Sequence, residues 1–139
     1  MDATQVQAQM VADGWTPITD EGFIGLVGPF YQLDTPTGPR FAFPTFAKHH
    51  NLRGVLQGGA LMTFADRIMG ITARAITHAQ RTATVQLNVQ FIDAVQIGET
   101  VEAQPTVLRA TRSLMFMTTL LTVGDRIVGS GNGVWKRLA

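Results

Sequence analysis

The sequence predicts an α+β fold, in which one long helix packs on a face of an antiparallel β-sheet. Residues 58–77 form the longest uninterrupted helical stretch, with apolar side chains at helical spacing. The segments that follow, from residue 83 onward, carry strand signals separated by turns. With 139 residues and 45% hydrophobic content, the chain is expected to form a single domain, 1–139, with a sizeable core.

Shorter elements are expected before the long helix. Residues 3–13 are predicted to form a short amphipathic helix that ends at Gly14. Residues 23–33 are predicted to form a strand region that Gly28-Pro29 interrupts, and residues 40–46 a further short strand. The connecting segments are a turn-rich stretch at 34–39 and a polar loop at 47–57.

On a wheel of 100° per residue, the long helix has an apolar side and a polar side. Arg67 and Arg74 lie with Thr63 on the polar side, and Asp66 lies at the border. Gly70 lowers the helix propensity but does not end the pattern. The apolar side is expected to comprise Leu61, Phe64, Ala65, Ile68, Ile71, Thr72 and Ala75.

Residues 83–92 alternate between apolar and polar side chains, which is the period of a half-buried strand. Pro105 argues for an edge position or a bulge in the next strand, because proline cannot donate to the ladder. Gly124-Asp125 are expected to form a hairpin turn. Further strands are expected at 100–109, 114–123 and 126–138. Glycines 129, 131 and 133 share a face of the last strand, which predicts close approach by another element, a ligand or a second subunit.

Composition narrows the possible functions. A net charge of +1 provides no basic footprint for nucleic acid, so no nucleic-acid partner is expected. The chain has no cysteine, which excludes disulfides, thiolate chemistry and cysteine-bound metal, and fits a reducing compartment. The N-terminus lacks the features of a signal peptide, and no apolar run is long enough to span a membrane. A cytoplasmic protein without a membrane partner is therefore expected.

The most informative stretch, residues 49–66, joins a polar loop to the start of the long helix. Asn51 lies in the loop, Gly58-Gly59 open the helix, and Asp66 follows two turns later. The first N–H groups of a helix lack partners within the helix and stabilise developing negative charge. A carboxylate in an apolar helix is costly unless it is paired or used. Together they suggest an oxyanion site beside a base or nucleophile.

Small and flexible side chains surround Asp66. Gly70 and Ala73 follow it at helical spacing, and Met62 and Met69 flank it. Such neighbours leave room for a ligand beside the carboxylate. Alternatively, the two small residues allow another element to cross the helix closely.

Simpler roles are also possible for several of these residues. Asp66 could be an ion-pair partner of Arg67 or Arg74 rather than a reactive group. His49 and His50 are adjacent, so their side chains point apart in an extended chain, and no acidic cluster accompanies them. No metal site is therefore expected. The glycine pair is not a phosphate-binding loop, because no Lys-Ser/Thr follows it.

The pattern His49-x-Asn51-x-x-Gly54-x-x-Gln57-Gly58-Gly59, followed by Asp66, resembles hotdog-fold acyl-CoA thioesterases, most closely the phenylacetate-pathway (PaaI-type) subfamily. Segments 26–31, 84–91 and 112–114 are also similar, so the resemblance covers most of the chain. It implies a hotdog fold, in which an antiparallel sheet wraps one central helix and subunits dimerise side by side. It also implies hydrolysis of an acyl-CoA to a free acid and CoA, with no cofactor beyond the substrate's own CoA.

The resemblance implies a role for each matching residue. Asp66 would be the general base or nucleophile, and the Gly58 N–H would polarise the carbonyl oxygen. Asn51 would position the thioester or a water, and His49 would orient the loop. Substrate contacts would further come from Gly59, Met62, Gly70, Thr84 and Arg112, the last at a CoA phosphate. The strand parity of Thr84, however, places it away from the apolar face.

Gln57 departs from the family pattern, which has histidine before the glycine pair. An amide can donate a hydrogen bond but cannot carry a proton. Gln57 would therefore hold the thiolate or the carbonyl without protonating the leaving group. The substitution also makes a non-catalytic acyl-CoA-binding protein, a sensor or relic, a second hypothesis. A purely structural oligomer is a third.

Helix geometry leads to an assembly prediction. Gly58 and Asp66 are eight residues apart, which is about 12 Å along a helix, so they cannot both touch one carbonyl within a single chain. Two antiparallel helices related by a two-fold axis would bring Gly58 of one subunit to Asp66 of the other. A homodimer or homotetramer is therefore expected, with acyl-CoA as the substrate. The sequence does not specify the acyl group.

Overall fold

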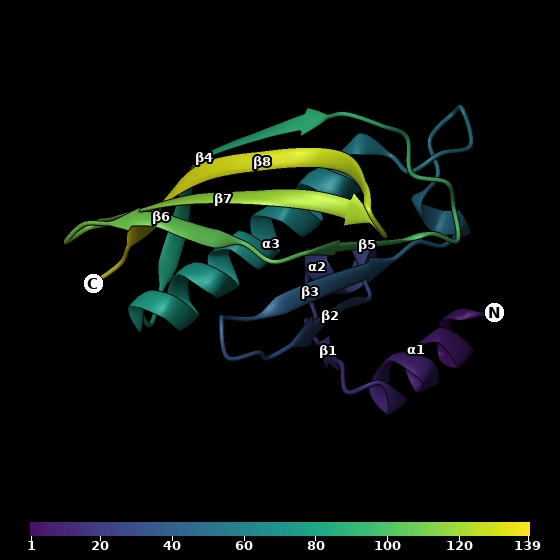
Figure 1. Cartoon of the computed structure of the whole chain (residues 1–139), viewed down its shortest axis with the longest axis horizontal. Helices are drawn as coiled ribbons and strands as arrows, with labels where there is room; N and C mark the ends of the chain where they lie inside the picture. Colours follow the sequence, from purple (N-terminus) through teal and green to yellow (C-terminus); the bar gives the residue numbers. More distant parts are fainter.

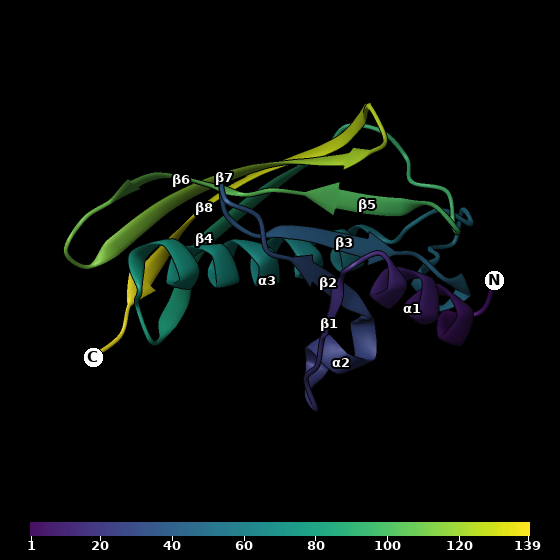
Figure 2. The same cartoon turned by 60° about the horizontal axis from the view of Figure 1, so that its bottom comes forward.

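The computed structural model describes residues 1–139 and shows a curved antiparallel sheet that arches over one long helix (Figure 1 and Figure 2). The strands are β1 (Thr16–Ile18), β2 (Phe30–Leu33), β3 (Arg40–Pro44), β4 (Thr82–Phe91), β5 (Thr100–Ala103), β6 (Thr106–Ala110), β7 (Leu114–Val123) and β8 (Arg126–Arg137). Their order in the sheet is β1-β2-β3-β5-β7-β8-β4, and β6 pairs with β7 beside this path. The arrangement is the hotdog fold, as the sequence predicted.

The central helix, α3 (Gly58–Thr77), has the predicted bounds. It begins because the side chain of Gln57 caps its first turn, and it ends at His78, which adopts a left-handed conformation. On its sheet side, Phe64 packs against Phe30 and Phe43, with ring centroids 5.2 and 5.4 Å away. No helix of the fold is long and apolar enough to cross a membrane.

The buried face of α3 is wider than the helical wheel predicted. Met69, Gly70 and Ala73 are buried, whereas Ala75 is exposed. The cause is the sheet, which covers the border of the helix as well as its apolar side. Trp135 of β8 lies so close to Gly70 that a Cβ there would approach the indole nitrogen to 3.4 Å.

Two differences from prediction lie before α3. The helix α1 (Ala3–Ala12) forms as expected, and Asp2 and Gln5 close a capping box at its start. However, the predicted strand at 23–33 is wrong in its first half, where α2 (Phe23–Val27) is helical. Ile24 and Val27 pack on the core, and their spacing of three residues suits a helix. The strand β1 was not predicted, because three residues are too few to show alternation.

The predicted strand at 100–109 is two strands. β5 pairs with β3 and with one residue of β7, and β6 pairs with β7 alone. Pro105 lies at the break, where its missing N–H would otherwise leave a gap in the ladder. The other expected strands form within one or two residues of their predicted bounds.

The three glycines of β8 are packed within the chain, and Gly131 faces α3. Gly129, Gly131 and Gly133 are buried, and a Cβ on Gly131 would lie 3.3 Å from the terminal methyl of Met69. The prediction of close approach is therefore confirmed: α3 approaches Gly131, and the backbone of β4 approaches Gly129 and Gly133. The suggestion that these glycines form a second subunit interface is wrong, because the chain covers them itself.

We expect Gly131 and Gly133 to respond differently to substitution by alanine. A Cβ on Gly133 would lie 2.3 Å from the Gln86 carbonyl oxygen, and backbone cannot move aside, whereas the Met69 methyl beside Gly131 can. Gly133→Ala should lower the free energy of unfolding by about 3 kcal/mol, and Gly131→Ala by about 1 kcal/mol or less. Urea titration measures both, and equal losses would contradict this account of the contact.

Candidate active site

The start of α3 presents two hydrogen-bond donors. The Oε1 of Gln57 accepts from the N–H groups of Gly59 and Ala60, so its Nε2 must point away from the helix. The N–H of Gly58 has no acceptor within the chain. Both donors therefore remain free at the positive end of the helix dipole.

The glycine pair is explained by its surroundings. A Cβ on Gly59 would lie 2.7 Å from Oε1 of Gln57, so the cap requires glycine there. A Cβ on Gly58 would lie 3.2 Å from the ring of Phe91, which packs over it from β4. The missing side chains thus allow both the cap and the close approach of Phe91.

Asp66 is half-buried and is held by a hydroxyl rather than by a cation. Thr84 Oγ1 of β4 donates to its Oδ1 over 2.7 Å. Asp66 forms no ion pair with Arg67 or Arg74, and Arg74 instead donates to Thr82. The alternative prediction that Asp66 forms an ion pair with Arg67 or Arg74 is therefore wrong. Its second oxygen has no partner in the chain.

A β-bulge turns Thr84 toward Asp66. Thr84 lies opposite Trp135 and Leu87 lies opposite Gly133, but the register shifts between them, with Val85 as the extra residue. Because of this extra residue, the side chains of β4 before Val85 lie on the face opposite to the one that simple alternation predicts. The prediction that Thr84 faces away from the helix is therefore wrong, whereas its predicted place near the acid is confirmed.

Asn51 organises the loop before α3. Its Oδ1 accepts from the backbone N–H groups of Arg53 and Val55, at 2.8 and 3.2 Å. Gly54 completes the turn at a positive φ of 82°, where other residues are strained. Only the Nδ2 of Asn51 remains free to contact a substrate or water.

His49 is a buried anchor, not a titrating group of the site. Phe46 N–H donates to its Nδ1 over 2.9 Å, so Nε2 carries the proton and donates to the Val27 carbonyl. Its own carbonyl accepts from Gln57 N over 2.8 Å, which ties α2 to the helix start. Burial lowers the pKa of His49. The hydrogen bond to the Val27 carbonyl opposes this by raising the pKa, and the Lys48 charge lowers it further.

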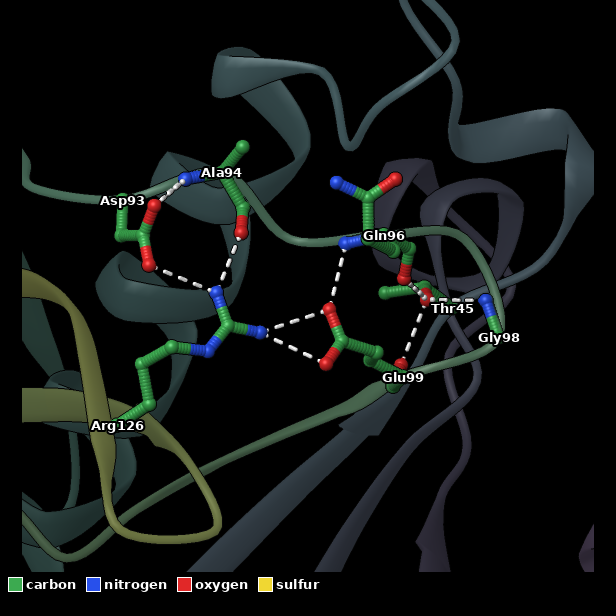
Figure 3. Close-up of polar contacts among 7 residues, drawn as sticks. All are labelled: Thr45, Asp93, Ala94, Gln96, Gly98, Glu99 and Arg126. Carbon is green, nitrogen blue, oxygen red and sulfur yellow. Dashed lines mark hydrogen bonds and ion pairs between the residues drawn. The ribbon is translucent and has the colours of Figure 1, made fainter.

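An ionic cluster fixes the loop behind the helix start (Figure 3). The guanidinium of Arg126 binds Glu99 through both carboxylate oxygens, at 2.7 and 2.8 Å, and Asp93 at 2.9 Å. The Gln96 N–H and Arg126 lower the pKa of Glu99, and Arg126 lowers that of Asp93. The loop carries Val95, whose carbonyl accepts from Leu56 N. The cluster therefore supports the residues just before α3.

The remaining predicted residues divide into near and distant groups. Met62 is half-buried on α3, and Gly59 lines a cavity at its start. Gly70 is buried under Trp135, which favours the alternative of close crossing over room for a ligand. Arg112 lies in the β6–β7 turn, far along the sheet from the helix start. No group of three or more His, Asp or Glu side chains converges to hold a metal ion.

Two hollows flank Gly58. One, of about 420 Å³, lies between α2 and the first turns of α3 and includes Gln57 and Gly59. The other, of about 340 Å³, lies between the Asn51 loop and Phe91 and includes Gly58 itself. The start of α3 thus lies between two hollows.

The thioesterase superfamily model matches residues 53–130, which contain the helix start, Asp66, Thr84 and most of the sheet. The chain belongs to the thioesterase superfamily. A Pseudomonas aeruginosa protein that is named as a proposed esterase is 29% identical over 128 residues, covering 90% of this chain and 96% of its own. Membership supports hydrolysis of acyl thioesters as the general chemistry.

Solved structures agree on the fold. Zebrafish thioesterase superfamily member 2 is 22% identical, with a TM-score of 0.77 over 99% of both chains. A mutant of the phenylacetic acid degradation protein PaaI from Thermus thermophilus is 20% identical, with a TM-score of 0.74 over 84% of this chain and 98% of that one. The PaaI protein of E. coli is 17% identical, with a TM-score of 0.68 over 98% and 88%. These structures confirm the hotdog fold, and two of the three are PaaI proteins.

Burial of His49 leads to a pH prediction. Because its pKa is lowered in the folded state, the unfolded chain takes up the proton first as pH falls. His49 therefore contributes stability above about pH 6.5, the ordinary value for histidine, and this contribution is lost as pH falls through the folded pKa. Urea titrations between neutral and mildly acidic pH should show a smaller slope for His49→Gln than for wild type. His50→Gln, the neighbouring control, should keep the wild-type slope, and a wild-type slope in His49→Gln would contradict the assignment.

Proposed function

We propose that the protein hydrolyses an acyl-CoA thioester to a free acid and CoA. The observation that carries this proposal is the unpartnered Gly58 N–H at the start of the same helix that holds Asp66 against Thr84. A helix-start donor suits a developing oxyanion, and a carboxylate with one free oxygen suits a base or nucleophile. Membership of the thioesterase superfamily supports the reaction type.

Within this proposal, each residue has a chemical task. The Gly58 N–H and the Nε2 of Gln57 stabilise the carbonyl oxygen as it becomes negative. Asp66 takes a proton from water as the water oxygen attacks the carbonyl carbon, or attacks that carbon itself. The C–S bond then breaks and CoA leaves as a thiolate, which takes its proton from Asp66 or from solvent. In the second route, water hydrolyses the resulting anhydride. Neither route needs a cofactor.

The site requires two copies of the chain. Gly58 and Asp66 are about 12 Å apart along α3, too far to act on one carbonyl. β4 lies at the outer edge of the sheet, beside α3, with no strand on its free side. It has no charged residue and no proline to discourage pairing, and Val85 and Phe91 are exposed on it. We propose that a second copy pairs here through its own β4, which places the two α3 helices side by side.

The bulge selects a register for this pairing. In antiparallel pairing through a two-fold axis at Asn88, Leu87 lies opposite Val89 of the partner subunit, with both facing the helices. Val85 is an extra residue, so Thr84 then lies opposite the partner's Phe91. Since Thr84 holds Asp66 and Phe91 covers Gly58, this register brings Asp66 to the Gly58 of the other subunit.

A cluster of cations at one end of the sheet suits the CoA phosphates. Arg137 and Lys136 lie opposite the start of β4, and the Arg137 N–H donates to Ser113, next to Arg112. None of these side chains pairs with an aspartate or glutamate. We propose Arg112 as a phosphate contact within this cluster, reached by the pantetheine arm. The cluster comprises Arg81, Arg109, Arg112, Lys136 and Arg137.

A single cysteine tests the proposed register. The chain has no cysteine, so Asn88→Cys would place its only thiol at the two-fold axis, at a separation that a disulfide can span. Mild oxidation should convert most of this variant to a covalent dimer on non-reducing gels. Gln90→Cys, on the same face of β4, would face position 86 of the partner and should cross-link far less. A monomer by light scattering, or equal cross-linking of the two variants, would contradict the pairing.

Asp66→Asn tests the chemistry, because it keeps the shape of the side chain and removes its charge. It should lower kcat by about a hundredfold or more in an assay of free thiol release from aromatic, short and long acyl-CoAs. Asp125→Asn in the β7–β8 turn is the matched control and should keep wild-type activity. Comparable turnover by Asp66→Asn would move the role elsewhere. Binding of the esters by wild type without turnover would favour the acyl-CoA-binding hypothesis, which Gln57 supports, and neither binding nor turnover would favour a structural oligomer.

A further inference from the structure

The helix α2 leaves two large apolar side chains uncovered. Ile24 and Val27 pack on the core, whereas Phe23 is 66% exposed and Leu26 is 74% exposed. α2 is therefore apolar on both sides, although it is only one turn and a half long. Figure 2 shows it beneath β1 and β2, next to α3 and away from the body of the sheet. An uncovered apolar pair on so short a helix suggests a ligand contact.

These side chains form one wall of the cavity of about 420 Å³ at the helix start. We call it the α2 groove. Its walls are Phe23, Leu26 and Val27 on one side and Gln57, Gly59 and Ala60 on the other. Gly59 has no side chain to fill the groove from the side of α3.

The groove is held open by bonds to the end of α2. Lys48 Nζ donates to the Leu26 carbonyl over 3.0 Å, and His49 donates to the Val27 carbonyl. Lys48 and His49 are thus turned to the backbone, and the third ionisable residue of the lining, His50, contacts the Asn51 carbonyl through its Nδ1. The groove is consequently preformed, its exposed surface is mainly apolar although polar residues also line it, and it includes Gln57 of the proposed oxyanion site.

The hollow on the other side of Gly58 differs in chemistry. Asn51, Arg53 and Asp93 lie in its wall, with Phe91 beside Gly58. A thioester at Gly58 has two limbs: the acyl group, and the pantetheine arm with its amides. This second hollow has a mixed lining, in which polar side chains stand among apolar ones, and suits the arm. The α2 groove, whose exposed surface is mainly apolar, suits an apolar acyl group. We infer that the α2 groove binds the acyl chain, that Phe23 and Leu26 set chain-length preference, and that the substrates are apolar acyl-CoAs longer than acetyl-CoA. This inference rests on the proposed function.

A chain-length series tests the groove. Wild type should hydrolyse decanoyl-CoA with a higher kcat/KM than acetyl-CoA. Leu26→Ser or Phe23→Ser should lower the ratio of the decanoyl-CoA kcat/KM to the acetyl-CoA kcat/KM about tenfold, the usual effect of losing apolar contact with a substrate chain. Leu108→Ser on β6 is a matched control, since Leu108 is 65% exposed and lies outside both hollows. Ala60→Leu, which fills the groove from α3, should shift the preference to shorter chains. An unchanged ratio in all three groove variants would overturn the inference while leaving the proposed function intact.

Two further measurements distinguish an acyl-binding groove from a subunit interface and from a protein without esterase activity. If the serine variants change the oligomeric state by light scattering, the α2 pair is an interface between copies and the inference is overturned. If wild type hydrolyses no ester, the proposed function fails, and binding of decyl-CoA and ethyl-CoA thioethers by calorimetry then tests the groove alone. Tighter binding of the decyl compound that Leu26→Ser abolishes would support the groove as an alkyl site. Equal affinity for the two compounds would overturn it.

Discussion

The close contact between α3 and the strands β4 and β8 is the constraint on which the rest of the structure depends. Gly131 on β8 allows the helix to approach until the terminal methyl of Met69 packs where a Cβ would lie. Trp135 closes the same gap over Gly70. This contact fixes the distance from the helix to β4, so the bulge at Val85 can deliver Thr84 to Asp66. Stability and chemistry therefore share one set of contacts, as is expected where a site is built on rigid elements.

Much of the fold follows from local sequence signals. The bounds of α3 were predictable because the glycine pair opens a long helical pattern of apolar residues, and the end of β7 because Gly124-Asp125 indicate a hairpin turn. The free N–H of Gly58 was predictable for the same reason, because the first N–H groups of a helix lack partners within the helix in any fold. The resemblance to the PaaI-type subfamily added the proposed role of Asp66, which lies within the residues that the family model matches.

Other features depend on contacts that a single segment does not encode. The orientation of Thr84 depends on one extra residue in β4, and only the pairing with β8 reveals it. α2 is too short for a helical period to emerge from its five residues, so two apolar pairs looked like a strand. The orientation of the Gln57 amide is set by the N–H groups of Gly59 and Ala60, which the sequence places nearby but does not connect. Geometry between subunits is likewise absent from one chain's sequence.

The cap at Gln57 gives one side chain two tasks, because the amide that caps α3 also sets which chemical group stands at the helix start. A carbonyl oxygen has two lone pairs and can accept from two backbone N–H groups at once, whereas neutral imidazole offers one acceptor nitrogen. The family pattern has histidine, which can carry a proton, at this position. Gln57 instead has a neutral amide, whose oxygen caps the first turn of α3. Replacing Gln57 by histidine would therefore weaken the cap while introducing a group that can carry a proton. Helix capping and the chemistry available at position 57 thus depend on one side chain.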